Sequence, residues 1–434
     1  MTTEAKPLRI AINAQLLPGG GSGGIEQFVA GLVHGLGRLQ DGNEEYVIVG
    51  HWLDPQALAP LVGSNQRIVS GPHGSRLQAA KHLARRALGP VYGLARRAAH
   101  AARPAPEARA VNRARQIPES GGLFEALDVD VVHFPYQTFT RCAVPTIYNP
   151  HDLQHLHYPE FFTHDEINRR ETLYSQACRT AQAVVADARC VRDDIISHYG
   201  VEPARTYAII PGPPSELYET VSDEILARVR RKFRLPETFA LYPAQTWPHK
   251  NHIRLLEALK LLRDQSGLSP PLVCTGTRNE FWPTIRNRMR DLRLGDRVRF
   301  LGFVAPVELR ALYRLAQFVV FPSLFEGAGL PILEAFAEGA PVACSAVTSL
   351  AEYGGDAVLP LDPTSVESIA EALRRMTLES NLRAALRARG AARARLFSWE
   401  KAARAYRALY RKMGGVTLTE EDARLLSEAS ASEA

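Results

Sequence analysis

Residues 321–342, with the sequence FPSLFEGAGLPILEAFAEGAPV, decide the fold. An apolar strand ends near Phe321 and runs into a glycine-rich turn. Pro331 then begins a helix, because proline suits the first helical position, where an N–H has no partner in any case. The free amides of this helix start point into the turn and can bind an anion such as a diphosphate. The acids on either side of the turn, Glu326 and Glu334, can accept hydrogen bonds from sugar hydroxyls. The stretch therefore favours a ligand with both groups, such as a nucleotide-activated sugar.

This combination of strand, EGxGL turn, Pro-started helix and two glutamates with seven residues between them resembles a known signature. It is similar to that of the retaining glycosyltransferases of family 4, also called glycosyl transferases group 1, which have the GT-B fold. The resemblance implies that Glu326 contacts the transferred sugar and that Glu334 contacts the ribose of the nucleotide. It also implies donor contacts from the residues of the turn, which are Gly327, Ala328, Gly329 and Leu330.

The second half of the chain alternates strands and helices from Phe239 onward. Five apolar strands, each followed by a helix, predict a parallel, doubly wound sheet with right-handed crossovers. With the resemblance, the expected fold is α/β and GT-B: two Rossmann-like, doubly wound parallel-sheet domains that face a cleft, and a C-terminal helix that crosses back to the N-terminal domain. The expected divisions are an acceptor-side domain at 1–214 with a basic insertion at 76–115, a nucleotide-sugar-binding domain at 215–395, a crossover helix at 396–413 and a solvated acidic tail at 414–434.

Lys250 lies in AQTWPHKNH, between a strand and a helix, where the helix dipole disfavours a lysine that has no ligand to bind. The resemblance implies that it binds the donor diphosphate. The family often has an Arg five residues earlier, where this chain has Gln245, so one fixed positive charge is missing. The strand end at Phe303 and Val304 resembles the place where the nucleotide base lies, and a plain strand end remains the alternative.

Residues 8–14, LRIAINA, predict a buried strand, and a glycine-rich loop and a helix follow it. The loop lacks the GxGxxG order. The resemblance implies that its Gly23 and Gly24 face the cleft and help to hold the donor phosphates or the acceptor. A later strand leads into His151 and Asp152, a position at which open α/β sheets place ligand-binding groups. The segment HDLQHLHYPEFF is similar to a family 4 subgroup in which the first histidine reaches the donor sugar, so His151 is a candidate with Asp152 in support.

No catalytic metal and no cofactor are expected. His155 and His157 lie in a proline-bounded loop and are expected at the surface, and no set of His, Cys and acidic residues has metal-ligand spacing along the chain. The catalytic residues expected instead are Glu326, His151 and Lys250. Lys250 and the turn amides would stabilise the charge that gathers on the leaving nucleoside diphosphate.

Composition and charge narrow the classes of protein. At 46% hydrophobic and 23% charged residues the 434-residue chain is globular, and it has neither a membrane-spanning apolar run nor a signal-peptide pattern. We therefore expect a cytoplasmic protein. Its net charge of +6 arises from residues 76–115, which carry ten Lys and Arg against the single acid Glu107. This segment is either an amphipathic helix on an anionic membrane surface, at the inner face of the membrane, or a solvated helix pair. Nucleic acid is not expected, since no binding motif accompanies the charge.

These features and the family resemblance predict a metal-independent glycosyltransferase, and the resemblance alone implies that it retains the anomeric configuration. It would move a hexose from a nucleotide-diphosphate sugar to a glycan or lipid-linked acceptor in surface-polysaccharide biosynthesis. The subgroup resemblance favours GDP-mannose over UDP-sugars. Two alternatives stay open: a nucleotide-sugar epimerase of the same fold, and a non-catalytic basic protein that binds nucleic acid or anionic lipid.

Overall fold

The structure is a computed structural model that describes residues 6–16, 23–73 and 116–431. The chain forms two compact units. Unit 1 comprises Met1–Asp187, Arg192–Ile209 and Glu400–Ala434, and unit 2 comprises Ala188–Val191 and Ile210–Trp399. The units meet in sequence at Ile209–Ile210, a few residues before the expected division at 214. The basic insertion predicted at 76–115 lies outside the described residues.

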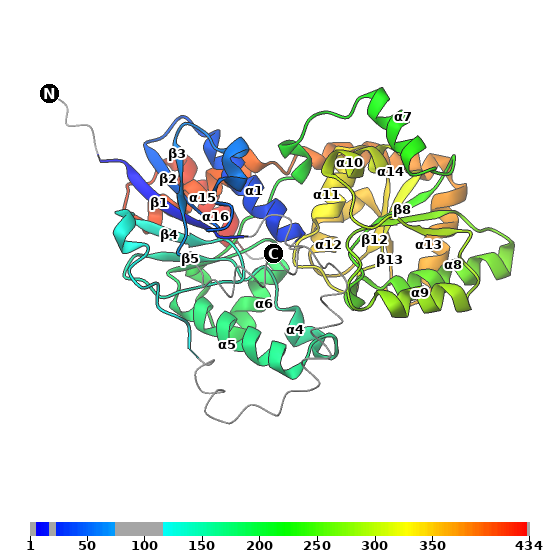
Figure 1. Cartoon of the computed structure of the whole chain (residues 1–434), viewed down its shortest axis with the longest axis horizontal. Coiled ribbons are helices and arrows are strands. Elements are labelled where there is room, and N and C mark those ends of the chain that lie inside the picture. The colour runs from blue at the N-terminus through cyan, green and yellow to red at the C-terminus, as the bar shows by residue number, and fades with distance from the viewer. Residues whose placement is uncertain (1–5, 17–22, 74–115, 432–434) are drawn as a thin grey trace. The chain divides into compact units, whose positions relative to one another are not determined.

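Unit 1 contains a seven-stranded parallel sheet with the order β3-β2-β1-β4-β5-β6-β7 (Figure 1). Its strands are β1 (Leu8–Ala14), β2 (Glu44–Gly50), β3 (Gln66–Ser70), β4 (Val131–Phe134), β5 (Thr146–Tyr148), β6 (Ala183–Ala186) and β7 (Thr206–Ala208). The central strands are almost wholly buried, as strands of a parallel sheet covered on both faces should be. The strand order reverses between β1 and β4, the kind of position at which open parallel sheets bind ligands.

The helices of unit 1 come from both ends of the chain. They are α1 (Gly24–Gly37), α4 (Gln154–His157), α5 (His164–Thr180), α6 (Arg189–Tyr199), which begins in unit 2, α15 (Trp399–Met413) and α16 (Glu420–Ser430). Two buried contacts fix α15 in unit 1. The Tyr410 hydroxyl lies 2.8 Å from His133 Nδ1, and Asn149 Nδ2 donates a hydrogen bond to the Tyr406 hydroxyl over 2.8 Å. The predicted return of the C-terminal helix to the N-terminal domain is confirmed.

The expectation of a solvated tail at 414–434 is wrong for its central part. Residues 420–430 form α16, in which Thr419 and Asp422 make a reciprocal capping box. One face of α16 is buried through Leu425, Leu426 and Ala429, and Asp422 forms an ion pair with Arg411 over 2.9 Å. The acidic residues that suggested a tail instead start a helix, where the dipole favours them.

Unit 2 contains a six-stranded parallel sheet with the order β10-β9-β8-β11-β12-β13. Its strands are β8 (Ala240–Pro243), β9 (Leu272–Thr275), β10 (Val298–Phe300), β11 (Phe318–Phe321), β12 (Val342–Ser345) and β13 (Val358–Leu361). The five predicted strands are present, and β13 is a sixth that the sequence pattern did not reveal. The Rossmann-like, doubly wound architecture is confirmed in both units.

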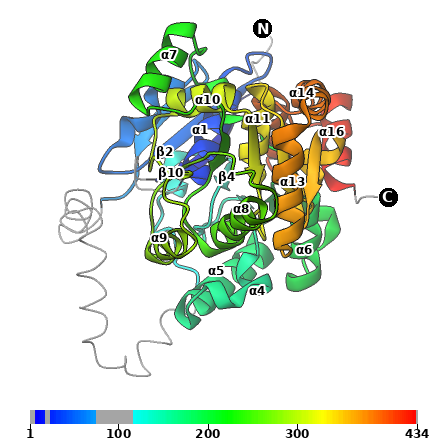
Figure 2. The ribbon, with the colours of Figure 1, turned by 90° about the vertical axis from the view of Figure 1, so that its right-hand side faces the viewer.

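The helices of unit 2 cover both faces of this sheet. They are α7 (Asp223–Lys232), α8 (His252–Ser266), α9 (Trp282–Asp291), α10 (Pro306–Leu315), α11 (Leu330–Ala337), α12 (Thr348–Gly354), α13 (Val366–Leu378) and α14 (Ser380–Ala394). Helices α8 and α13 pack side by side on one face (Figure 2), and α10 and α11 pack together on the other. In the described part of the chain, no helix combines the length and the apolar character that a membrane crossing requires.

Candidate functional site

Lys250 and Glu326 follow adjacent strands at the point where the strand order of unit 2 reverses. The paired strands are β8 and β11, with Ala240 opposite Phe318. In open parallel sheets, ligands bind in the crevice at such a switch point. Lys250 Nζ donates a hydrogen bond to Glu326 Oε1 over 2.6 Å, and the two side chains are only 15% and 9% exposed. The structure thus joins two of the predicted residues in one largely buried ion pair.

The loop that carries Lys250 is fixed to the loop after β11. Residues Pro248–Lys250 form a 3-10 turn, and Asn251 ends the turn in the left-handed region with a φ of 61°, which asparagine tolerates. The Asn251 side-chain amide donates hydrogen bonds to the carbonyls of Pro322 (2.9 Å) and Pro363 (2.7 Å). Lys250 is therefore held over the β11–α11 turn by backbone geometry as well as by its charge.

The backbone of Glu326 is held from both sides by the start of α12. Its N–H donates to Thr348 Oγ1 over 3.2 Å, and its carbonyl accepts a hydrogen bond from Ser349 Oγ over 2.9 Å. Two hydroxyl groups thus orient the turn so that the Glu326 carboxylate faces Lys250. Thr348 and Ser349 were not among the predicted site residues, although consecutive hydroxyl residues after the strand β12 were a usable signal.

Helix α11 begins at Leu330, one residue earlier than expected, and Gly329 before it makes no side-chain cap. Pro331 has no N–H, and the Ile332 N–H donates to the Gly329 carbonyl over 2.9 Å. Gly327, Gly329 and Leu330 are buried and Ala328 is partly exposed. Gly329 lies against Tyr353 of α12, and a Cβ at this position would stand 2.8 Å from Tyr353 Cδ2. The close contact between the two helices therefore requires glycine. The Leu330 amide at this helix start has no side-chain cap from Gly329, and together with Lys250 on the neighbouring loop it can bind an anion.

Glu334 lies on α11 beside α10. Its Oε2 accepts a hydrogen bond from the Tyr313 hydroxyl over 2.8 Å. Burial raises the pKa of Glu334 to about 7, and the nearby Glu338 carboxylate adds to this, while Tyr313 and Arg310 act in the opposite direction. The carboxyl is therefore close to half protonated at neutral pH. Its contact with a ribose stays a prediction, and Tyr313 is a partner that the sequence analysis did not find.

Gln245 stands where the family often has an arginine. Its Oε1 accepts a hydrogen bond from the Trp247 indole N–H over 2.9 Å. Arg278 is the basic residue that follows the next strand, β9. It donates a hydrogen bond to the Phe300 carbonyl over 2.9 Å and lies over the Trp282 ring, 4.5 Å from its centroid. The guanidinium of Arg278 is thus used locally. Lys250 carries the positive charge beside Glu326.

The predicted base-binding position has two different side chains. Phe303 is 78% exposed, whereas Val304 is 8% exposed and packs into the interior. Phe303 can offer a ring to a flat ligand, but Val304 can contribute only its backbone. The binding of a nucleotide base here stays a prediction.

His151 belongs to unit 1, where it follows β5. It is buried, has a φ of 66°, and both ring nitrogens have partners: Nδ1 lies 2.6 Å from Asp187 Oδ2 and Nε2 lies 3.0 Å from the Pro135 carbonyl oxygen. Burial lowers the pKa of His151, but the charge and hydrogen bond of Asp187 outweigh burial and, with Asp152 and the Pro135 carbonyl, raise the pKa above its usual range. Both ring nitrogens face acceptor oxygens, an arrangement that the imidazolium form satisfies because it donates from both nitrogens.

The predicted sugar contact of His151 stays a prediction, because both its nitrogens are bonded within unit 1 in this conformation. Asp187 is a residue that the sequence analysis missed. The available signal was an acid directly after the buried strand β6. Asp152 has a local role as well, since its Oδ1 accepts a hydrogen bond from the backbone N–H of Gln154 over 3.1 Å.

The helix that follows the glycine-rich loop in sequence contacts His151. Gly23 has a φ of 54° and stands immediately before α1, whose first residue is Gly24. One turn later Phe28 packs edge-on against the His151 ring, with 4.9 Å between centroids. The loop residues 17–22 lie outside the described part. The structure thus places Gly24 one helical turn before a residue that contacts His151, and the predicted role of Gly23 and Gly24 stays a prediction.

The expectation that His155 is a surface residue is wrong. His155 is 1% exposed, its Nε2 lies 2.8 Å from Glu171 Oε1, and its ring packs edge-on against Tyr174. His157, two residues later, is partly exposed at 37% of its side chain. The different exposure of the two histidines follows from α4, because residues two apart on a helix point to nearly opposite sides of it.

Comparison with known proteins places these features in a family. Residues 225–393, which make up most of unit 2, match the model of the glycosyl transferases group 1 family. The chain is 32% identical over 255 residues to O-antigen chain mannosyltransferase B of Escherichia coli, covering 58% of this chain and 66% of that protein. It is 28% identical over 277 residues to D-inositol 3-phosphate glycosyltransferase of Corynebacterium glutamicum, covering 62% of this chain and 66% of that protein. The matches thus span about two thirds of these curated relatives.

Solved structures extend the likeness in fold to both units. The crystal structure of HepE from Anabaena, in complex with UDP and glucose, superposes with a TM-score of 0.65 at 17% identity and covers 93% of this chain and 100% of that one. At this identity the likeness concerns the fold. The chain therefore has the GT-B fold, and its residues 225–393 belong to the glycosyl transferases group 1 family.

Proposed function

We propose that this protein transfers a hexose, with retention of configuration and without a metal, from a nucleoside-diphosphate sugar to a glycan or lipid-linked acceptor in surface-polysaccharide biosynthesis. One observation carries the proposal: the Lys250–Glu326 ion pair at the switch point of unit 2, on the turn that leads into α11. A cation for a diphosphate and a carboxylate for a sugar occur together there, as a nucleotide-sugar site requires.

Binding of the donor would exchange the partners of this pair. The diphosphate, which carries more negative charge than one carboxylate, would draw the ammonium of Lys250 to itself, and the amides at the start of α11 would donate to its oxygens. The carboxylate of Glu326, released from Lys250, would then accept hydrogen bonds from sugar hydroxyls. Each group has a partner before and after binding, so no buried charge is left uncompensated.

The same groups would assist the chemical step. The bond between the sugar and the diphosphate breaks, and the electron pair moves to the leaving phosphate oxygen. Lys250 and the helix amides stabilise that growing negative charge more than they stabilise the intact donor, which is the condition for catalysis. The leaving oxygen accepts the proton of the attacking hydroxyl on the same face. No side chain is assigned as a general base.

The identity of the donor sugar and its nucleotide is proposed from the relatives and from a solved structure. Among the relatives in sequence is an O-antigen chain mannosyltransferase, which supports mannose and a polysaccharide acceptor. The HepE complex holds UDP and glucose, so a UDP-sugar is the competing donor. We propose GDP-mannose as the donor and a growing glycan as the acceptor.

The proposal is tested first by binding and then by transfer. The thermal unfolding of the full chain should shift upward with GDP or GDP-mannose, and less with UDP, ADP or dTDP and their sugars, in buffer that contains EDTA. Mannose transfer to a lipid-linked glycan should then proceed in the same buffer. Glu326→Gln should slow transfer by about 100-fold or more, because it weakens an interaction that the transition state needs. Glu237→Gln, an exposed carboxylate, is the matched control.

Each contrary result identifies a different error. Transfer that stops in EDTA and resumes with a divalent ion would refute metal independence. Release of free nucleotide with an epimerised sugar and no need for an acceptor would favour the epimerase. Stabilisation by no nucleotide, together with salt-dependent DNA binding, would favour the binding protein. Unchanged turnover in Glu326→Gln would remove Glu326 from the site.

A further inference from the structure

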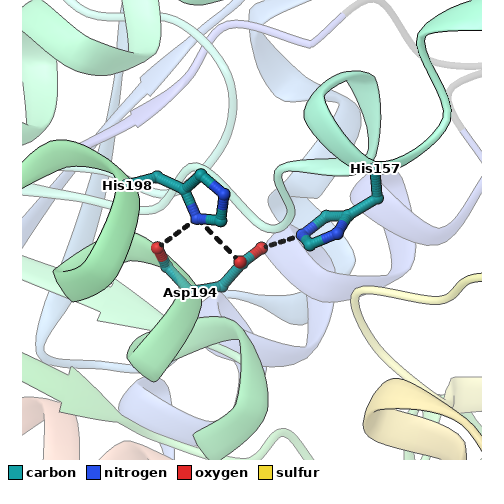
Figure 3. A group of neighbouring side chains, drawn as sticks. All are labelled: His157, Asp194 and His198. Carbon is teal, nitrogen blue, oxygen red and sulfur yellow. Dashed lines mark hydrogen bonds and ion pairs between the residues drawn. The ribbon is translucent and has the colours of Figure 1, made fainter.

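Three side chains with metal-binding atoms converge on the surface of unit 1, where the family assignment requires none. They are His157 at the end of α4 and Asp194 and His198 on α6 (Figure 3). His157 Nε2 lies 2.7 Å from Asp194 Oδ2, and His198 Nδ1 lies 2.9 Å from Asp194 Oδ1. The two imidazoles therefore approach one carboxylate from its two oxygens.

The arrangement follows from the helix and from one long-range contact. Asp194 and His198 are four residues apart on α6, so their side chains share one face of the helix. His157 arrives from a segment 37 residues away in sequence, as measured to Asp194. This separation explains why spacing along the chain gave no sign of a metal site. Among the described residues, this is the one group of three or more His, Cys, Asp or Glu whose ligand atoms all lie within 4.8 Å of one another.

We propose that His157, Asp194 and His198 bind a divalent transition ion of the Zn²⁺ type. Ligand atoms around a tetrahedral zinc ion at the usual bond lengths stand roughly 3.3 Å apart. The present separations are slightly shorter where the residues are hydrogen-bonded, and all are within 4.8 Å, so small side-chain rotations suffice to admit the ion. Each coordinating nitrogen gives up its hydrogen, either to the other ring nitrogen or to solvent, as metal binding to histidine requires.

The ligand set selects the class of ion. Imidazole nitrogens suit zinc, copper and nickel, whereas magnesium and calcium favour oxygen ligands alone. Asp194 supplies one negative charge that partly offsets the dication. The side chains of the three residues are 37%, 15% and 42% exposed, so an ion can enter from solvent and a water can complete a tetrahedral shell.

The ion would connect two segments of the chain, one that starts at His151 and one that starts at its partner Asp187. His157 lies six residues after His151, and Asp194 lies seven residues after Asp187. Coordination at the far ends of both segments would close a loop around that buried pair. The metal is therefore a structural clip for the part of unit 1 that holds His151, outside the chemistry of sugar transfer and independent of the proposed donor.

The test is direct metal binding by the full chain, prepared without a histidine tag and treated with a chelator. Isothermal titration with ZnCl₂ should give one equivalent with micromolar or tighter affinity, and the melting temperature should rise with Zn²⁺. Asp194→Asn and His198→Gln should each weaken this binding by at least about 100-fold, since loss of a ligand exceeds the loss of an outer-shell partner. Neither effect should appear with MgCl₂.

His164→Gln is the matched control, because His164 is an exposed histidine nearby in sequence that lies outside the cluster. It should bind Zn²⁺ as the unaltered chain does. The proposal would be overturned if Asp194→Asn and His198→Gln bound Zn²⁺ with the same affinity and stoichiometry as the control. Binding would then be due to other histidines. Absence of any micromolar equivalent in the unaltered chain would overturn it as well, and would mean that the three residues are a hydrogen-bonded surface network only.

Discussion

The carboxyl of Glu334 is subject to opposing influences. Burial and the Glu338 carboxylate favour its protonated form, while the Tyr313 hydroxyl and Arg310 favour the ionised form. Burial dominates and raises its pKa from 4.5 to about 7. The folded state thus binds this proton more tightly than the unfolded state does. The stabilisation that follows is complete at low pH and is lost as the pH rises from about 4.5 through about 7.

Glu334→Gln should therefore stabilise the protein at high pH. The amide is neutral at every pH and can still accept the Tyr313 hydrogen bond. Relative to the unaltered chain, the free energy of unfolding should rise by on the order of 3 kcal/mol at pH 8 and change little near pH 4.5. Chemical denaturation at a series of pH values measures this difference.

Glu237→Gln, which removes an exposed carboxylate, should show no such pH-dependent gain. A difference between Glu334→Gln and the unaltered chain that stays constant from pH 4.5 to pH 8 would contradict the raised pKa. If Glu334 also binds the ribose, the same variant should bind nucleoside diphosphates more weakly while it is more stable. That combination distinguishes a ligand contact from a folding defect.

Single residues of the candidate site were predictable from the sequence, but the contacts between them were not. Glu326 stands in a glycine-rich turn and Lys250 stands just before a helix start, and both are local signals. Their ion pair depends on two strands that are neighbours only through the sheet order, and local sequence carries no information on that contact. The same holds for Asp187 with His151. A pattern of period two or 3.6 fixes which face a residue lies on, but not which distant side chain meets it there.

At the scale of elements, the β11–α11 turn depends on α12. Helix α12 supplies the hydroxyls that hold Glu326 and the Tyr353 ring that contacts Gly329. Tyr353 is fully buried and stacks on Phe397, with 5.7 Å between ring centroids, so its ring has little room to move. A small change at the start of α11 is therefore transmitted to the groups that orient Glu326.

Gly329→Ala should disturb both stability and donor binding. Its new Cβ would stand 2.8 Å from the Tyr353 ring, which must shift together with α12. We expect a loss of about 1–3 kcal/mol in the free energy of unfolding, the usual effect of overpacking a core. The affinity for nucleoside diphosphate should fall as well, because the turn amides and Glu326 move. Denaturation and calorimetric titration measure the two effects.

Gly295→Ala is the control, since a Cβ there meets no atom within 4 Å and its φ is ordinary. It should leave stability and affinity close to those of the unaltered chain. If Gly329→Ala matched this control in both measurements, the contact between α11 and α12 would have no role in shaping the turn.

Helix boundaries were predictable where the sequence carries a chemical signal for them. Pro306 begins α10, and Pro331 lies in the first turn of α11. The helix α16 was missed although Thr419 and Asp422 form a capping box, because its many acids suggested a solvated tail. The short strands β3 and β13 were missed as well. A strand of four or five residues has too few positions to establish a period.

On the scale of the whole molecule, unit 1 is completed by the end of the chain. Helix α15 supplies Tyr406 and Tyr410 to the buried network of His133 and Asn149. Arg411 then links α15 to β2 and α16, through Glu44 at 2.7 Å and Asp422 at 2.9 Å. Unit 1 therefore cannot reach its full stability until residues 400–430 are present, whereas the sheet of unit 2 is built from consecutive residues.

Removal of residues 416–434 should destabilise unit 1 selectively. It exposes the surface that Leu425 and Leu426 cover and takes Asp422 from the partly buried Arg411, a loss of about 3–5 kcal/mol in all. Calorimetry should show one transition at a lower temperature, while the transition of unit 2 and its affinity for nucleoside diphosphate are kept.

Removal of residues 432–434 alone is the control and should change neither transition. If both transitions fell together in the longer deletion, the two units would unfold as one cooperative body, and the contribution of α16 could not be assigned to unit 1.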